Sequence, residues 1–97
     1  MVLLLFIIGI PLFAVEEGIS EFYKNGMDAY KKGQYDLAIQ EFESILSDNW
    51  GSPELYYNLG NAYYRVGDTP GAVWAFESCL KLSPTHSDAQ YNLELAN

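Results

Sequence analysis

The sequence predicts an all-α fold made of helix pairs that stack on one another. Three observations predict it: self-similarity with a period of 34 residues, helix start and stop residues at matching places in each period, and apolar residues spaced three or four apart between those places. One helix pair does not bury its own apolar face, so successive pairs must stack to form a core. With 97 residues, the chain has room for one small domain.

The period appears when the sequence is compared with itself at an offset of 34 residues. The matched positions are Tyr23, Tyr57 and Tyr91, Gly26 and Gly60, Tyr30 and Tyr64, Lys31 and Arg65, Gly33 and Gly67, Ala38 and Ala72, Phe42 and Phe76, and Leu46 and Leu80. So many matches in one register indicate an internal repeat.

Helix start and stop residues are clearest in the second period. Ser52 is expected to cap a helix that begins at Pro53, and Gly67 to end it in the left-handed conformation. Thr69 is expected to cap the next helix, with Pro70 in its first position. Breaks between helices are therefore predicted near Gly33, near Trp50 to Ser52, near Gly67 and near Ser83 to His86.

Small residues are expected where the two helices of a pair cross. Gly60, Ala72 and Cys79 fill this role in the second period, and Gly26 and Ala38 in the first. Cys79 is interpreted as a small buried hydrophobe rather than a reactive thiol.

The first fifteen residues, Met1 to Val15, carry no charge and are followed by Glu16 and Glu17. Their length matches the apolar part of an export signal, with Ala14 as a candidate cleavage residue. The segment is short for a membrane span, which needs roughly 20 apolar residues. An uncleaved N-terminal anchor and a buried helix are the two other interpretations.

The charge balance excludes several functions. Against 13 acidic residues the chain has 5 basic ones, a net charge of -8, which argues against binding nucleic acid or an anionic membrane surface.

The lone Cys79 and the lone His86 provide no metal-ligand cluster, and His86 is expected to be a solvated loop residue. No nucleophile–base–acid set and no phosphate-binding glycine loop is present. The sequence therefore predicts neither an enzyme nor a cofactor, and no small-molecule substrate.

The second period resembles the tetratricopeptide repeat (TPR) family. The residues that carry the resemblance are Tyr56, Leu59, Gly60, Tyr63, Gly67, Ala72, Phe76, Cys79 and Pro84. The first period departs from the family at Asn25, Ile45 and Trp50, which stand where Leu, a small residue and Pro are usual. The resemblance implies helix-turn-helix repeats in a short right-handed superhelix, with units at 19–52 and 53–86. Residues 87–97 are then a capping helix or the start of a third, truncated unit.

In TPR proteins the first helices of the repeats line a concave groove that binds peptides, so the resemblance implies a protein-binding module. The implied partner-binding residues are Tyr23, Met27, Tyr30, Lys31, Tyr57, Asn61, Tyr64, Arg65, Asp88 and Tyr91. Lys31 and Arg65 suit an extended peptide with an acidic group. For the tyrosines, packing between neighbouring helices is the alternative. A clamp for a peptide C-terminus, as in chaperone-binding members, is not expected, because Tyr23 and Met27 replace its Lys and Asn.

A narrower resemblance concerns Tyr56 to Pro84 and residues 88–97, which are similar to the repeat proteins of bacterial aerotolerance (Bat) operons. It implies an exported scaffold of a bacterial envelope complex, periplasmic or membrane-associated, with von Willebrand-type domain proteins as partners. Two alternatives stay open: a membrane-tethered or intracellular chaperone-like adaptor, and an accessory domain of a larger envelope enzyme.

Trp74 lies one residue off the apolar stripe of its helix and is interpreted as part of a second contact surface.

Overall fold

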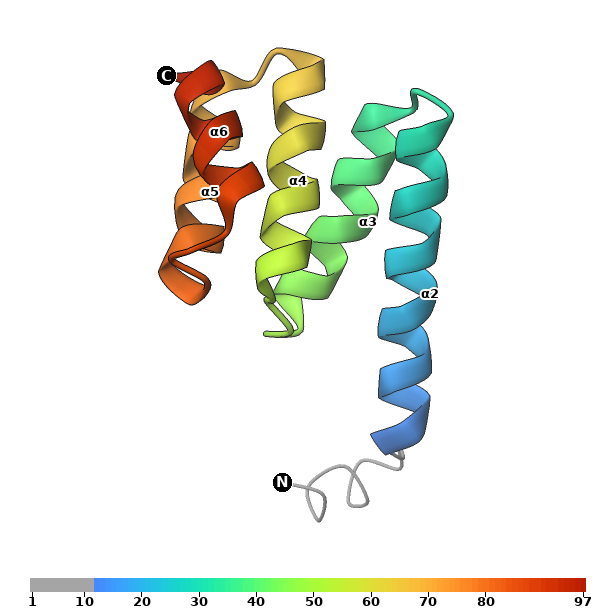
Figure 1. Ribbon diagram of the computed structural model, residues 1–97. Coiled ribbons are helices and arrows are strands. Elements are labelled where there is room, and N and C mark those ends of the chain that lie inside the picture. The colour runs from blue at the N-terminus through green and yellow to red at the C-terminus, as the bar shows by residue number, and fades with distance from the viewer. Residues whose placement is uncertain (1–11) are drawn as a thin grey trace.

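The computed structural model describes residues 12–97, and in this range Figure 1 shows helices that pack one after another along the chain. They are α2 (Leu12–Lys31), α3 (Tyr35–Ser47), α4 (Pro53–Val66), α5 (Thr69–Leu82) and α6 (Ser87–Ala96). No strand occurs among these residues. The predicted all-α, TPR-type stack is confirmed: α2 pairs with α3, α4 pairs with α5, and α6 covers the second pair.

All four predicted breaks lie between helices. Gly33 separates α2 from α3 with a left-handed φ of 77°, and Gly67 ends α4 with a φ of 86°. The α3–α4 and α5–α6 connections fall at residues 48–52 and 83–86.

Helix α4 begins as predicted, whereas α5 and α6 begin differently. The Ser52 hydroxyl accepts a hydrogen bond from the Leu55 N–H at 3.1 Å. The prediction of Thr69 as the next cap is wrong, because the Asp68 carboxylate accepts from the Gly71 N–H at 3.0 Å and Thr69 lies inside α5. Asp is the stronger cap, and its charge also favours the helix N-terminus. His86 is a half-buried cap of α6 rather than a solvated loop residue.

Each helix pair crosses where a glycine faces a phenylalanine ring. A Cβ atom at Gly26 would lie 2.5 Å from the Phe42 ring, and one at Gly60 would lie 2.6 Å from the Phe76 ring. Ala38, Ala72 and Cys79 are fully buried, which confirms that small residues line the crossings. Because these backbones approach so closely, the pairs are rigid supports for the side chains that they expose.

The N-terminal end of α2 runs beyond the other helices (Figure 1). The interpretation of Met1 to Val15 as an export signal falls mostly on residues outside the described range. From Leu12 the helix continues to Lys31, so the first helix starts earlier than the unit boundary expected at Ile19. Within residues 12–97, none of the helices has the length and apolar character that spanning a bilayer requires.

Candidate partner-binding face

The residues predicted to bind a partner lie on α2 and α4, the first helices of the two pairs, and on α6, which covers the second pair. We call this surface the first-helix face. Its members are Tyr23, Met27, Tyr30 and Lys31 on α2, Tyr57, Asn61, Tyr64 and Arg65 on α4, and Asp88 and Tyr91 on α6.

Two side-chain bridges join α2 to α4 and α4 to α6 in the same register. The Asn58 amide donates to the Tyr23 hydroxyl at 2.6 Å, and the Asn92 amide lies 3.5 Å from the Tyr57 hydroxyl. Asn92 also donates to the Asn61 side-chain oxygen at 2.8 Å. Each asparagine follows its tyrosine by 35 residues, so the bridge recurs with the repeat.

Tyr23 and Tyr57 pack between helices, which is the alternative that the sequence left open for them. The Tyr23 ring lies 5.8 Å from the Phe42 ring, and the Tyr57 ring lies 6.2 Å from Phe76 and 4.9 Å from His86. Burial raises the pKa of the Tyr23 hydroxyl, and the hydrogen bond from Asn58 opposes this shift. These tyrosines therefore contribute to the packing between helices, and only their half-buried edges are exposed to solvent.

The exposed aromatic side chains of this face are Tyr64 and Tyr91. Tyr64 is 45% exposed and Tyr91 is 63% exposed, although Tyr91 has the same register as Tyr23 and Tyr57. A tyrosine offers a large apolar area with a polar tip at a low cost in conformational entropy, which suits a contact surface. Met27, in contrast, is half-buried and packs against the core.

An aromatic–cation group closes one end of the face. The Arg65 guanidinium lies 4.6 Å from the centre of the Tyr35 ring, and the Tyr35 and Tyr30 rings are 5.2 Å apart. The sequence missed Tyr35, because it lies on α3 and thirty positions before Arg65. Lys31 is exposed, and the nearby Asp28 forms an ion pair with Lys24 at 3.5 Å.

A cavity of about 310 Å³ opens at the other end of the face. It lies between the middle of α2, the end of α3 and the start of α4, and is lined by Ile19, Ser20, Tyr23, Lys24, Ile45, Trp50, Ser52 and Leu55. Of these only Tyr23 was a predicted site residue. The feature of the sequence that could have indicated this cavity is Trp50, which replaces the proline usual in TPR units and forms one wall of the cavity. Apolar walls with three hydroxyls and an ammonium group suit an apolar side chain that has a polar or negative group beside it.

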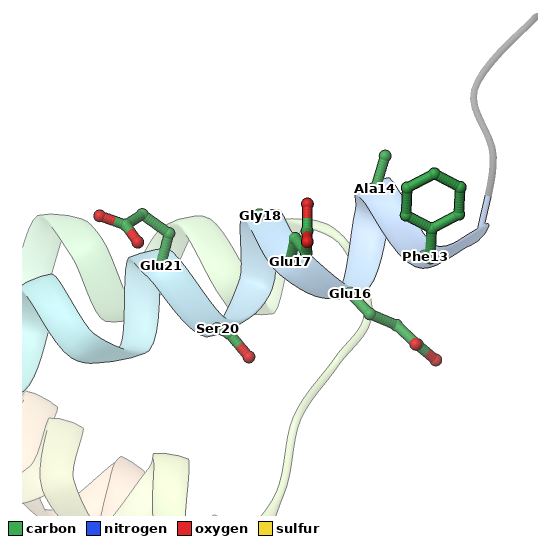
Figure 2. Close-up of a pocket in the computed structure, with 7 residues that line it drawn as sticks. All are labelled: Phe13, Ala14, Glu16, Glu17, Gly18, Ser20 and Glu21. Atoms are coloured by element: carbon green, nitrogen blue, oxygen red, sulfur yellow. The ribbon is translucent and has the colours of Figure 1, made fainter.

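Two other features carry no site. Figure 2 shows a hollow along the N-terminal part of α2, and all of its described lining residues belong to this one helix. Glu16 and Ser20 point to one side of the helix, and Ala14 and Glu17 point to another, so these side chains do not converge on a ligand. Cys79 is fully buried, and this burial raises the pKa of its thiol. In residues 12–97 no group of His, Cys, Asp or Glu side chains is arranged to hold a metal ion.

Comparisons with known proteins agree with the helical-repeat fold. A family model described as "YfiO: Outer membrane lipoprotein" matches residues 16–96. Hsp70-Hsp90 organizing protein 2 of Arabidopsis thaliana is 27% identical over 62 residues, which are 64% of this chain and 11% of that protein. Superkiller protein 3 of Saccharomyces cerevisiae is 29% identical over 66 residues, 68% of this chain and 5% of that protein. The chain therefore spans only a small part of these two relatives.

Proposed function

We propose, from the premise that this chain belongs to the YfiO family of outer membrane lipoproteins, that it is a non-catalytic protein-binding module of the bacterial envelope. The family description supports the envelope location. The TPR-type stack supports protein binding, as does the name of the Arabidopsis relative, which describes a protein that organizes other proteins. No lipid attachment is proposed for Cys79, because its side chain is fully buried in α5.

The observation that carries the proposal is the layout of the first-helix face. The cavity at one end includes Leu55 of α4, and the exposed Tyr64 and Arg65 lie nine and ten residues further along the same helix. At 1.5 Å per residue the rise along the axis of α4 is about 14 Å, which an extended segment of about four residues covers in that direction.

The proposed ligand follows from these two ends. An apolar side chain of the partner fills the cavity beside Trp50. The partner's backbone then runs past the half-buried Tyr57 and Asn61, and an acidic group reaches Lys31 and Arg65. Contacts with exposed charges are weakened by salt, so binding is expected to decrease as ionic strength rises.

The double substitution Tyr64→Ala with Arg65→Ala tests this face. It is expected to leave the helix content measured by circular dichroism unchanged and to weaken binding of a recovered partner by about tenfold or more. Partners are recovered by pull-down from native envelope fractions and then measured with the purified proteins by calorimetry. The matched control, Leu37→Ala with Gln40→Ala, changes two exposed residues of α3. A folded double variant that keeps every wild-type partner would rule out the first-helix face.

The envelope location has its own test. N-terminal sequencing of the protein from its native cell is expected to find a mature start near Val15 or Glu16. An intact Met1 would contradict export. Proteins with von Willebrand-type domains stay predicted partners. Mass spectrometry of the proteins recovered by pull-down from envelope fractions shows whether they are present.

A chaperone-like adaptor is the second candidate, which the similarity to the Hsp70-Hsp90 organizing protein favours. Tyr23 and Met27 remain unsuited to a carboxylate clamp, and the Tyr23 hydroxyl already accepts from Asn58. An intact Met1 together with recovery of an Hsp70 or Hsp90 would favour the adaptor over the envelope module. Recovery of an enzyme fused to this chain in the full reading frame would instead indicate an accessory domain.

A further inference from the structure

A second hollow lies away from the first-helix face. It has a volume of about 360 Å³, and we call it the outer cleft. Its walls come from the end of α3, the α3–α4 connection, the start of α4, and α5. The lining residues are Leu46, Asn49, Gly51, Tyr56, Trp74 and Leu82.

The apolar residues of the outer cleft are not required by the repeat fold. Trp74 is 49% exposed and Leu82 is 55% exposed. The positions 34 residues earlier hold Gln40 and Asp48, both exposed. Because the first unit folds with polar residues at these positions, burial in a repeat core does not explain the apolar residues of the second unit.

The walls of the outer cleft are held in place by contacts within the chain. The Tyr56 and Trp74 rings meet edge to face, with centres 5.8 Å apart and planes at 81°. Gly51 lets the connection lie against Tyr56, since a Cβ atom there would be 2.9 Å from the Tyr56 hydroxyl. Asn49 has a left-handed φ of 62°, which asparagine tolerates well. A fixed hollow binds with a smaller entropy cost than one that must form on binding.

We propose that the outer cleft binds one large apolar side chain of a partner protein, in a segment where Lys or Arg flanks that side chain. The volume is at the lower end of the range for ligand sites, so one or two side chains fit and a large cofactor does not. Asp48 adjoins Asn49, Glu77 lies one helical turn from Trp74, and the whole chain has a net charge of -8. Lys81 next to Leu82 is the one basic residue of α5, so the cleft's surroundings remain negative on balance.

The outer cleft uses no residue of the first-helix face, so the proposal is independent of the proposed function. Asn49 and Gly51 of the outer cleft alternate along the α3–α4 connection with Trp50 and Ser52 of the other cavity, so the two sites are neighbours that share no lining residue.

Three synthetic peptides test the proposal. The first has one central Phe with two Lys on each side, the second replaces the Lys by Glu, and the third replaces the Phe by Ser. Binding to the isotope-labelled full chain is followed by NMR at the Trp74 indole N–H and the amides of Asn49 and Gly51. The first peptide is expected to shift these signals to saturation and to bind about tenfold or more tightly than the other two.

Substitutions that copy the first unit provide the matched variants. Trp74→Gln and Leu82→Asp install the residues that stand at positions 40 and 48, so the fold is expected to stay intact. Each substitution is expected to weaken binding of the first peptide by about tenfold. Tyr64→Ala with Arg65→Ala is expected to leave this binding unchanged, which separates it from the first-helix face.

Three results would overturn the proposal. They are equal binding of the Lys and Glu peptides, unchanged binding by the folded Trp74→Gln variant, and Trp74-dependent self-association of the chain in sedimentation measurements without peptide binding.

Discussion

His86 shows how one side chain can both start a helix and support the binding face. Its Nδ1 atom accepts from the Ala89 N–H at 3.1 Å, and its ring lies 4.9 Å from that of Tyr57. His86→Ala is expected to destabilise the fold by about 1 kcal/mol, because a cap of α6 is lost. Urea unfolding measures the change, and Thr85→Ala, one residue earlier and exposed, is the control. Equal stability of both variants would show that the cap contributes nothing.

Cys79 is expected to be unreactive in the native protein. The thiolate is the reactive form, and burial both raises the pKa of this thiol and excludes reagent from the fully buried sulfur. Labelling with Ellman's reagent at neutral pH should therefore be slow in buffer and fast in denaturing guanidinium chloride, which serves as the control. Fast labelling under native conditions would contradict the position of Cys79 at the α4–α5 crossing.

At the scale of helices, the α4–α5 pair depends on Gly60. Gly60→Leu is expected to destabilise the fold by about 1–3 kcal/mol or more, because the added atoms collide with the Phe76 ring. The control is Gly18→Leu in α2, where a Cβ atom has no neighbour within 4 Å and Leu is the better helix former. Thermal unfolding followed by circular dichroism should show a lower midpoint only for Gly60→Leu. An unchanged midpoint would mean that the crossing is elsewhere.

The helices could be predicted from the sequence because their boundaries depend on local chemistry. Ser52, Pro53 and Gly67 mark the ends of α4 by capping and by backbone preference. Asp68 rather than Thr69 caps α5, a choice that the stronger capping by Asp and its charge at the helix N-terminus would have indicated from the sequence.

The candidate site could be predicted only in part, because it depends on contacts between elements. The period places Tyr64 and Arg65 on a first helix, but it does not indicate that Arg65 stacks on Tyr35 of α3. It also aligns Tyr91 with Tyr57 without showing that one is exposed and the other half-buried. The cavity beside Trp50 was missed for the same reason, since three separate elements form its walls.

At the scale of the whole molecule, the structure is a thin slab of 46 × 29 × 18 Å. Packed helices lie 8–10 Å apart, so a thickness of this size accommodates about two layers of helices. Few residues are then remote from solvent, and surfaces on both layers remain accessible to partners. This shape is compatible with a scaffold that contacts one protein through the first-helix face and another through the outer cleft.

The two repeat units are expected to unfold together. The core of the first unit contains Leu55, Leu59 and Ala62 of α4, and Tyr63 packs against both cores. The first unit therefore lacks part of its core until the second unit has folded. Nearest-neighbour stacking of this kind makes a short repeat array cooperative.

The two tryptophans allow this cooperativity to be measured, because Trp50 reports on the end of the first unit and Trp74 on the second. Both side chains are 42–49% exposed, so Trp50→Phe and Trp74→Phe should each leave a folded protein with a single fluorescent reporter. For each variant, the urea midpoint measured by tryptophan fluorescence is compared with the midpoint of its own circular dichroism curve. After this correction, the fluorescence midpoints of the two variants are expected to coincide. Adding Gly60→Leu should lower both midpoints by the same amount, although residue 60 belongs to the second unit. Separate midpoints, or a shift seen only by Trp74, would show that the units unfold independently and that α4 does not join the two cores.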